Sequence, residues 1–119
     1  MNSHKTEGEA EKNQNEQGSS ALGFIHKKTE KLITAVYMLS NFFPHEEPIK
    51  WDVRQKSLSL LEALGTVFYH GDHEGRNLLK EATRYIDEII SLLELSRIVG
   101  LISHMNFSVI KNEFLSLKK

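Results

Sequence analysis

Apolar residues recur along this chain at alternating spacings of three and four, from Phe24 to the end. This spacing places them on one side of an α-helix, whereas a half-buried strand would alternate every second residue. Four such stretches are separated by short segments that contain Gly, Pro, His or Ser. We therefore predict an all-α protein. Short connections between helices predict an up-down-up-down antiparallel four-helix bundle.

The predicted helices cover about residues 23–43, 48–69, 76–99 and 104–117. Two of them have especially regular apolar stripes with heptad-like spacing. The first stripe consists of Ile25, Thr29, Leu32, Val36, Leu39 and Phe43. The stripe of the third predicted helix consists of Leu79, Ala82, Ile86, Ile89, Leu93 and Ser96.

Several residues mark the helix boundaries. Pro44 and Pro48 end the first helix and start the second, because Pro is disfavoured inside a helix but tolerated in its first turn. Gly100 is expected to cap the C-terminus of the third helix, and Ser103 to cap the N-terminus of the fourth. Trp51, near a helix start, fits either the core or a partner contact.

Residues 1–22 are predicted to form a disordered tail, and residues 23–119 to form the bundle. The first 20 residues are mostly Glu, Asn, Gln, Lys, Gly and Ser, and this composition cannot bury enough apolar surface to fold. The segment also has no apolar run of the kind found in a signal peptide. Since no stretch is long and apolar enough to span a bilayer, we expect a cytoplasmic protein without membrane contact.

Charge and cysteine content narrow the possible functions. The formal net charge is -1, and the chain contains no cysteine, which excludes disulfides, thiolate metal sites and cysteine nucleophiles. This net charge lacks the strong positive value of an obvious nucleic-acid-binding protein, so nucleic-acid binding would need basic residues gathered on one face. Apolar stripes wider than the core requires predict self-association, with surplus surface at Tyr37, Leu60 and Ile98.

Candidate catalytic or metal-binding residues are few. The bundle topology would bring His26, His70 and His73 to one end, near Asp72 and Glu74. Imidazole and carboxylate groups can bind metal, but His, Gly and Asp are also common in solvated loops. The sequence has neither a Gly-rich phosphate loop nor spacing that supports a Ser-His-Asp triad. We therefore expect no enzymatic activity, no cofactor and no resident metal.

Basic residues are arranged more regularly. Arg76, Lys80 and Arg84 are spaced by four along one predicted helix, and Lys50 and Arg54 form a similar pair on another. Cations at this spacing can follow a phosphate backbone, although an ordinary solvated helix face has the same appearance. The five residues are the predicted nucleic-acid-binding site.

The chain resembles a known superfamily in three segments: TEKLITAVYML at 29–39, RQKSLSLL at 54–61, and IDEIISLLELSRIVGLI with the following SHMNFSVIKNEFLSL at 86–117. They are similar to the helices of a four-helix-bundle superfamily. It includes accessory variability proteins of diversity-generating retroelements and proteins encoded in intervening sequences of large-subunit ribosomal RNA genes. The resemblance covers residues 24–117 and rests mainly on apolar positions and the Gly100 turn.

This resemblance implies a ring-shaped homo-oligomer, typically a pentamer. In retroelements such a ring binds the reverse transcriptase and nucleic acid, RNA or DNA, through basic surface residues. By position, these residues would be Lys50, Arg54, Arg76, Lys80 and Arg84.

Three hypotheses follow from the sequence. The first is a non-enzymatic, oligomeric accessory protein that binds a reverse transcriptase and nucleic acid. The second is a protein-interaction or scaffolding bundle without nucleic-acid binding. The third is a metal-dependent activity at His26, His70 and His73.

Overall fold

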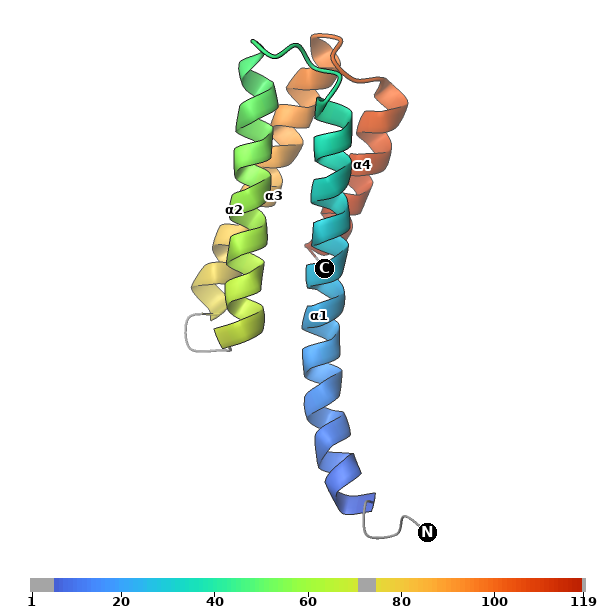
Figure 1. Ribbon diagram of the computed structural model, residues 1–119, viewed down its shortest axis with the longest axis vertical. Helices are drawn as coiled ribbons and strands as arrows, with labels where there is room; N and C mark the ends of the chain where they lie inside the picture. The colour runs from blue at the N-terminus through green and yellow to red at the C-terminus, as the bar shows by residue number, and fades with distance from the viewer. Residues whose placement is uncertain (1–5, 71–74, 119) are drawn as a thin grey trace.

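The computed structural model describes the backbone of residues 6–70 and 75–118, and the side chains of residues 21–67 and 77–118. The described residues form four helices (Figure 1). Their bounds are α1 (Thr6–Ser40), α2 (Pro48–His70), α3 (Gly75–Ile98) and α4 (His104–Leu117). The last three begin and end within one residue of the predicted bounds.

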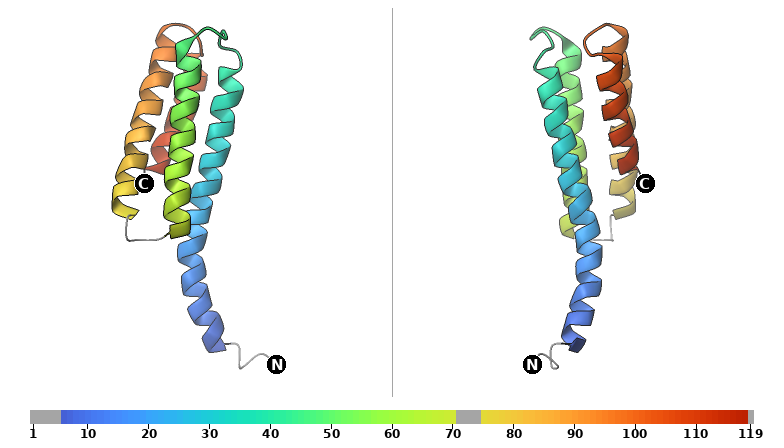
Figure 2. Two further views of the ribbon diagram at one scale, coloured as in Figure 1. Left: turned by 60° about the vertical axis from the view of Figure 1, so that its left-hand side comes forward. Right: turned by 90° about the vertical axis from the view of Figure 1, so that its right-hand side faces the viewer.

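The helices alternate in direction, and the predicted up-down-up-down bundle is confirmed (Figures 1 and 2). Each helix packs against its neighbour in the sequence, and α1 also packs against α4, which closes the ring. The packing of α2 against α3 and α1 is the most extensive, and that of α1 against α4 is the least. Since α4 is the shortest helix, it covers only the half of the bundle nearest the α3–α4 turn.

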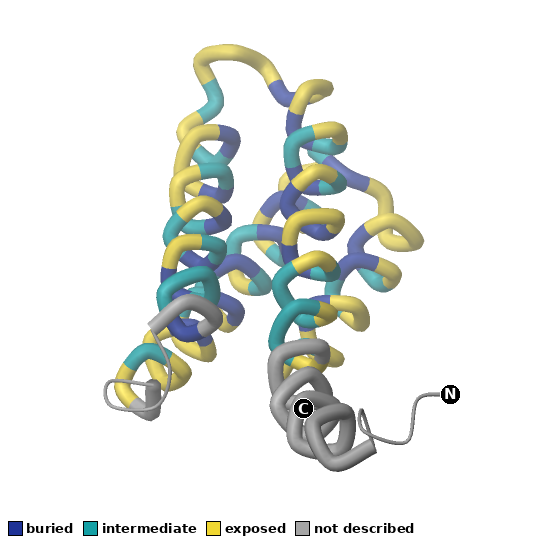
Figure 3. The backbone as a smooth tube through the Cα atoms, turned by 60° about the horizontal axis from the view of Figure 1, so that its bottom comes forward, coloured by how far each residue is buried: buried dark blue, intermediate teal, exposed yellow. Residues whose placement is uncertain are grey.

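The core runs along the inner sides of all four helices, where buried residues gather (Figure 3). Among the apolar residues that it buries most completely are Val36, Val53, Leu60, Ile89, Leu93 and Phe114. Buried hydroxyl residues in the middle of the helices include Thr29, Ser57 and Ser96. Each hydroxyl donates to the carbonyl four residues earlier in its own helix, at 2.7–2.8 Å. These polar groups are therefore satisfied without a partner on another helix.

α1 differs most from the prediction. It ends at Ser40 rather than near Phe43, because the chain then tightens into turns in which the Phe43 amide donates to the Ser40 carbonyl at 3.0 Å. At its other end, its backbone continues to Thr6 and projects beyond the rest of the bundle (Figure 1). The backbone of residues 6–20, which belong to the predicted tail, thus lies mainly outside the packed body (Figure 1). The disorder of the tail, residues 1–22, stays a prediction.

The α3–α4 turn matches its predicted caps. Gly100 has φ 84°, in the left-handed region. Its amide donates to the Arg97 carbonyl at 3.1 Å, and the Leu101 amide donates to the Ser96 carbonyl at 2.8 Å. This pair of bonds is the Schellman motif that ends many helices. Ser103 then caps α4, because its side chain accepts a hydrogen bond from the Asn106 amide at 3.0 Å.

The prediction of surplus apolar surface is partly wrong. Leu60 is fully buried, since it lies on the inner side of α2. Ile98, at the end of α3, is exposed, whereas Tyr37 is half-buried. None of the helices, over the residues searched for membrane spans, is long and apolar enough to cross a bilayer.

Two glycines give opposite predictions for stability. Gly100→Ala should lower the free energy of unfolding by about 1 kcal/mol, because a side chain is disfavoured at positive φ. The position has open space around it, so no clash contributes. Gly65→Ala should instead raise it by about 0.5–1 kcal/mol, since Gly65 is helical and a Cβ there would meet His26 Nε2 at an ordinary 3.5 Å. Urea unfolding followed by circular dichroism measures both. Equal effects would contradict this explanation.

Candidate macromolecule-binding surfaces

The five predicted nucleic-acid-binding residues do not form one surface. Lys50 and Arg54 lie in the first turns of α2, near the α1–α2 connection. Lys80 and Arg84 lie in the first half of α3, which starts at the opposite end of the bundle (Figure 1). The Arg76 side chain lies outside the described residues. The structure thus separates the cations into two groups.

Lys50 is buried, at 9% exposure. Its Nζ donates to the Phe43 carbonyl at 3.4 Å and lies 5.2 Å from the centroid of the Trp51 ring. Trp51 is partly exposed, and its indole N–H donates to the His45 carbonyl at 2.8 Å. Both side chains therefore hold the α1–α2 connection, and Lys50 presents little surface to a ligand.

Arg54 joins α2 to the end of α1. Its Nε donates to Ser40 Oγ at 2.8 Å, and its Nη2 donates to the Tyr37 carbonyl at 3.1 Å and to Asn41 Oδ1 at 2.8 Å. Its Cζ also lies 4.6 Å from the Tyr37 ring centroid and 5.5 Å from that of Trp51. The last turn of a helix has unpaired carbonyls and partial negative charge, which a cation stabilises. A phosphate would have to displace these contacts.

The second group borders a hollow of about 610 Å³ on the outer side of α3, beside α2. Arg84 is exposed and pairs with Glu88 at 3.0 Å and Glu81 at 3.7 Å, whereas Lys80 is exposed and has no ion pair within the described residues. The lining comprises Lys56, Lys80, Thr83, Arg84, Asp87, Glu88, Ser91 and Leu92. Charges of both signs line this hollow, so its attraction for phosphate is modest.

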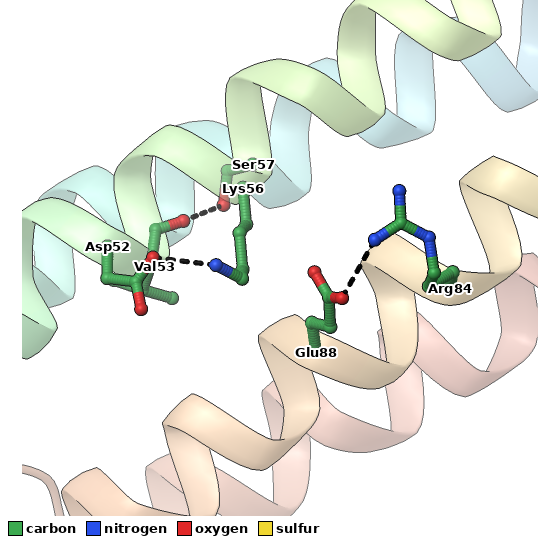
Figure 4. A network of polar contacts seen from close by, with 6 residues as sticks. All are labelled: Asp52, Val53, Lys56, Ser57, Arg84 and Glu88. Carbon is green, nitrogen blue, oxygen red and sulfur yellow. Dashed lines mark hydrogen bonds and ion pairs between the residues drawn. The ribbon is translucent and has the colours of Figure 1, made fainter.

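The polar contacts beside this hollow come from two helices (Figure 4). On α2, Lys56 Nζ lies 2.7 Å from Asp52 Oδ1, and this hydrogen bond raises the pKa of Lys56 above its usual value. Glu88 on α3 contributes to the same rise through its charge, while Arg84 opposes it. Lys56 is thus already compensated by carboxylates.

Two further cations are exposed on α1. Lys27 and Lys31 have no ion pair within the described part of the chain. They lie on the outer side of α1, one turn apart. Along with Lys80, they are more available to an anionic ligand than Lys50 or Arg54.

The predicted histidine cluster falls mostly outside the described residues. The side chains of His70 and His73 are not described. His26 Nδ1 lies 3.1 Å from Glu30 Oε1 on the same helix. Among the residues searched, no group of three His, Asp or Glu side chains is placed to hold a metal ion.

An apolar surface along the α1–α4 seam was not among the predicted sites. The register of α1 against α4 follows from Lys28, whose Nζ donates to Ser116 Oγ and lies 3.4 Å from Glu113 Oε2. The helices are antiparallel and both rise about 1.5 Å per residue. Met38, ten residues after Lys28, therefore lies at the level of Met105 near the start of α4.

Exposed apolar residues lie at the end of α1 and in the first half of α4. Met38 lies in the last turn of α1, and Phe42 lies in the turn that follows Ser40, where α1 ends. On α4, Val109 and Met105 precede Ser116 by about two and three turns. We call the four residues the α1–α4 apolar face, with exposed fractions of 64% for Met38, 86% for Phe42, 75% for Met105 and 61% for Val109.

The sequence alone shows part of the pattern of the α1–α4 apolar face. Met38, Phe42, Met105 and Val109 lie at helical spacings within each helix, but each pair is offset from the main apolar stripe. Recognising that the two pairs lie at the same level of the bundle requires the register that the Lys28 contacts supply.

No family model, curated protein or solved structure matches this chain in the comparisons with known proteins. The surfaces described above are therefore interpreted from their own geometry and chemistry.

Arg54→Lys should destabilise the bundle by about 1–2 kcal/mol, because an ammonium group cannot reproduce the guanidinium contacts to Ser40, Tyr37 and Asn41. Urea unfolding measures the change. The matched control is Lys80→Ala, which removes an exposed cation and should stay within about 0.5 kcal/mol of the unmodified protein. An Arg54→Lys protein as stable as this control would show that Arg54 does not hold α1 to α2.

Proposed function

We propose that this protein is a non-enzymatic helical bundle that self-associates and serves as an accessory binding subunit. The observation that supports this best is the α1–α4 apolar face. Water contact with large apolar side chains is unfavourable, and contiguous exposed apolar patches commonly mark interaction sites. Ala35 and Asn106, which lie at about the same level of the bundle, are also uncharged.

The size and chemistry of this face suit association between proteins. Four large side chains, each mostly exposed, present on the order of 500 Å² of apolar surface. Standard interfaces bury about 800 Å² per partner, with the apolar share concentrated at the centre. Two of the four residues are methionines, whose flexible side chains adapt to different neighbours. A second copy of the chain would cover the face in a symmetric dimer or a larger ring.

A more specific candidate is the accessory role in reverse transcription that the superfamily resemblance implies. The exposed Lys27, Lys31 and Lys80 favour it, because they have no ion pair within the described residues and can contact phosphate. In this proposal the oligomer gathers several weak basic surfaces into one larger nucleic-acid-binding surface. The reverse transcriptase and the pentameric ring come from the resemblance alone.

Introducing carboxylates into the α1–α4 apolar face tests the self-association. Light scattering coupled to size-exclusion chromatography should show an oligomer for the unmodified protein. For the double variant Phe42→Glu, Met105→Glu, the dissociation constant of the oligomer should rise by at least about tenfold, which shifts the protein towards smaller species. The reason is that the substitutions would bury four carboxylates in a symmetric contact. Circular dichroism checks the fold.

Leu58→Glu is the matched control, because Leu58 is a partly exposed apolar residue on α2, away from the α1–α4 apolar face. It should leave the oligomer intact. A monomeric unmodified protein, or a double variant that associates as strongly as the control, would overturn the proposed face.

Nucleic-acid binding has a separate test. Lys80→Glu with Arg84→Glu should weaken binding of a structured RNA by about tenfold or more and reduce its salt dependence, because both residues are exposed cations. Fluorescence anisotropy at several salt concentrations measures this. Lys50→Met should change the affinity by less than about twofold, since Lys50 is buried. An RNA affinity that is absent, or unaffected by the double variant, argues against this role.

A further inference from the structure

An apolar groove lies below the end of α4, separate from the α1–α4 apolar face. Its volume is about 320 Å³. Leu64 of α2 is at the floor, and α1 and α3 supply the two walls. The lining consists of Leu22, Ile25, Leu64, Leu79, Ala82, Thr83, Ile86, Leu117 and Lys118.

The groove arises from the difference in helix length. α4 has 14 residues and is about 21 Å long, whereas α3 has 24 and is about 36 Å long. The contact between Lys118 Nζ and Asp87, at 2.9 Å, marks where α4 ends against α3. Below Asp87, α3 continues for about three turns to Gly75.

The uncovered space is therefore the continuation of the fourth corner of the bundle (Figure 2). In the upper half this corner is occupied by α4, which packs against α1 and α3. In the lower half the same two helices present apolar side chains to the same corner. Leu79 is 47% exposed there, and Phe24, which precedes the lining residue Ile25 in the sequence, is 69% exposed. A helix of about three turns matches this space in shape and in its need for an apolar stripe.

The charges around the groove indicate which residues should flank the apolar stripe of a bound helix. Lys80 follows Leu79 in the sequence and lines the neighbouring hollow, which shares Thr83 with the groove; it is exposed and has no carboxylate partner among the described residues. Lys118 lines the end of the groove, and Lys28, about one turn after the lining residue Ile25, pairs with Glu113 of α4. The carboxylates nearby, Asp87 and Glu113, are each paired with one of these lysines. Lys80 therefore leaves an uncompensated positive charge beside the groove, which favours negative flanking residues in an occupant.

We propose that this groove binds an amphipathic helix of a partner protein whose apolar stripe is flanked by Asp and Glu. The partner helix completes the fourth corner of the bundle below α4, with its apolar residues against Leu64, Leu79 and Ile86 and its carboxylates near Lys80 and Lys118. The site and its occupant are distinct from the self-association proposed above.

Two synthetic peptides of about 14 residues test the proposal. Both have leucines at alternating spacings of three and four; the flanking residues are Glu in one and Lys in the other. The full-length protein should bind the fluorescein-labelled Glu peptide at least about tenfold more tightly than the Lys peptide, as measured by anisotropy. Leu79→Glu should weaken binding of the Glu peptide about tenfold, and Lys80→Glu should remove the preference for it. Leu58→Glu is again the control and should change neither.

Each alternative result is distinguishable. Absence of binding, or equal binding of both peptides that Leu79→Glu leaves unchanged, overturns the proposal. Loss of self-association in the Leu79→Glu protein, without peptide binding, would assign the groove to a second copy of this chain and also overturn it. The Phe42→Glu, Met105→Glu protein should still bind the Glu peptide, so failure of the self-association proposal leaves this test intact.

Discussion

Burial of one apolar stripe from each helix in a shared core is the constraint on which the rest of the structure depends. The hydroxyl groups of Thr29, Ser57 and Ser96 enter this core at no cost in unpaired donors, since each bonds within its own helix. Small side chains at such positions allow neighbouring helices to approach closely. Everything outside the shared core is free to serve other purposes, and the outer surface differs in character from one side of the bundle to another.

The outer surface around α4 differs most in character from the rest of the bundle. At the α1–α2 seam, Arg54 joins α2 to the end of α1 through three hydrogen bonds and two aromatic rings. Such a guanidinium is costly to detach, because its carbonyl and amide partners would lose a charged donor. The α1–α4 packing is less extensive, and both proposed binding surfaces border it. Exposed Met105 and Val109 lie at one end of α4, and the groove begins at the other.

The sequence determined most of the fold but little of the candidate sites. The bounds of α2, α3 and α4, the Gly100 turn and the Ser103 cap were predicted because they depend on local spacing and backbone chemistry. Burial of Lys50 and the attachment of Arg54 were not predicted, because they depend on the α1–α2 connection and on how closely the two helices approach. The α1–α4 apolar face needed the relative register of two distant helices. The unequal helix lengths were visible in the sequence, but the groove that they create requires the order of helices around the core.

The length of α4 also determines how much of the groove the chain itself covers. Three more turns appended to Leu117, with leucines at the right spacing, would occupy the same corner from within the chain. A tethered segment competes at an effective concentration in the millimolar range, far above that of most free proteins in a cell. Small changes in the length or apolar content of α4 could therefore switch the groove between open and self-occupied forms, while the core that supports both remains the same.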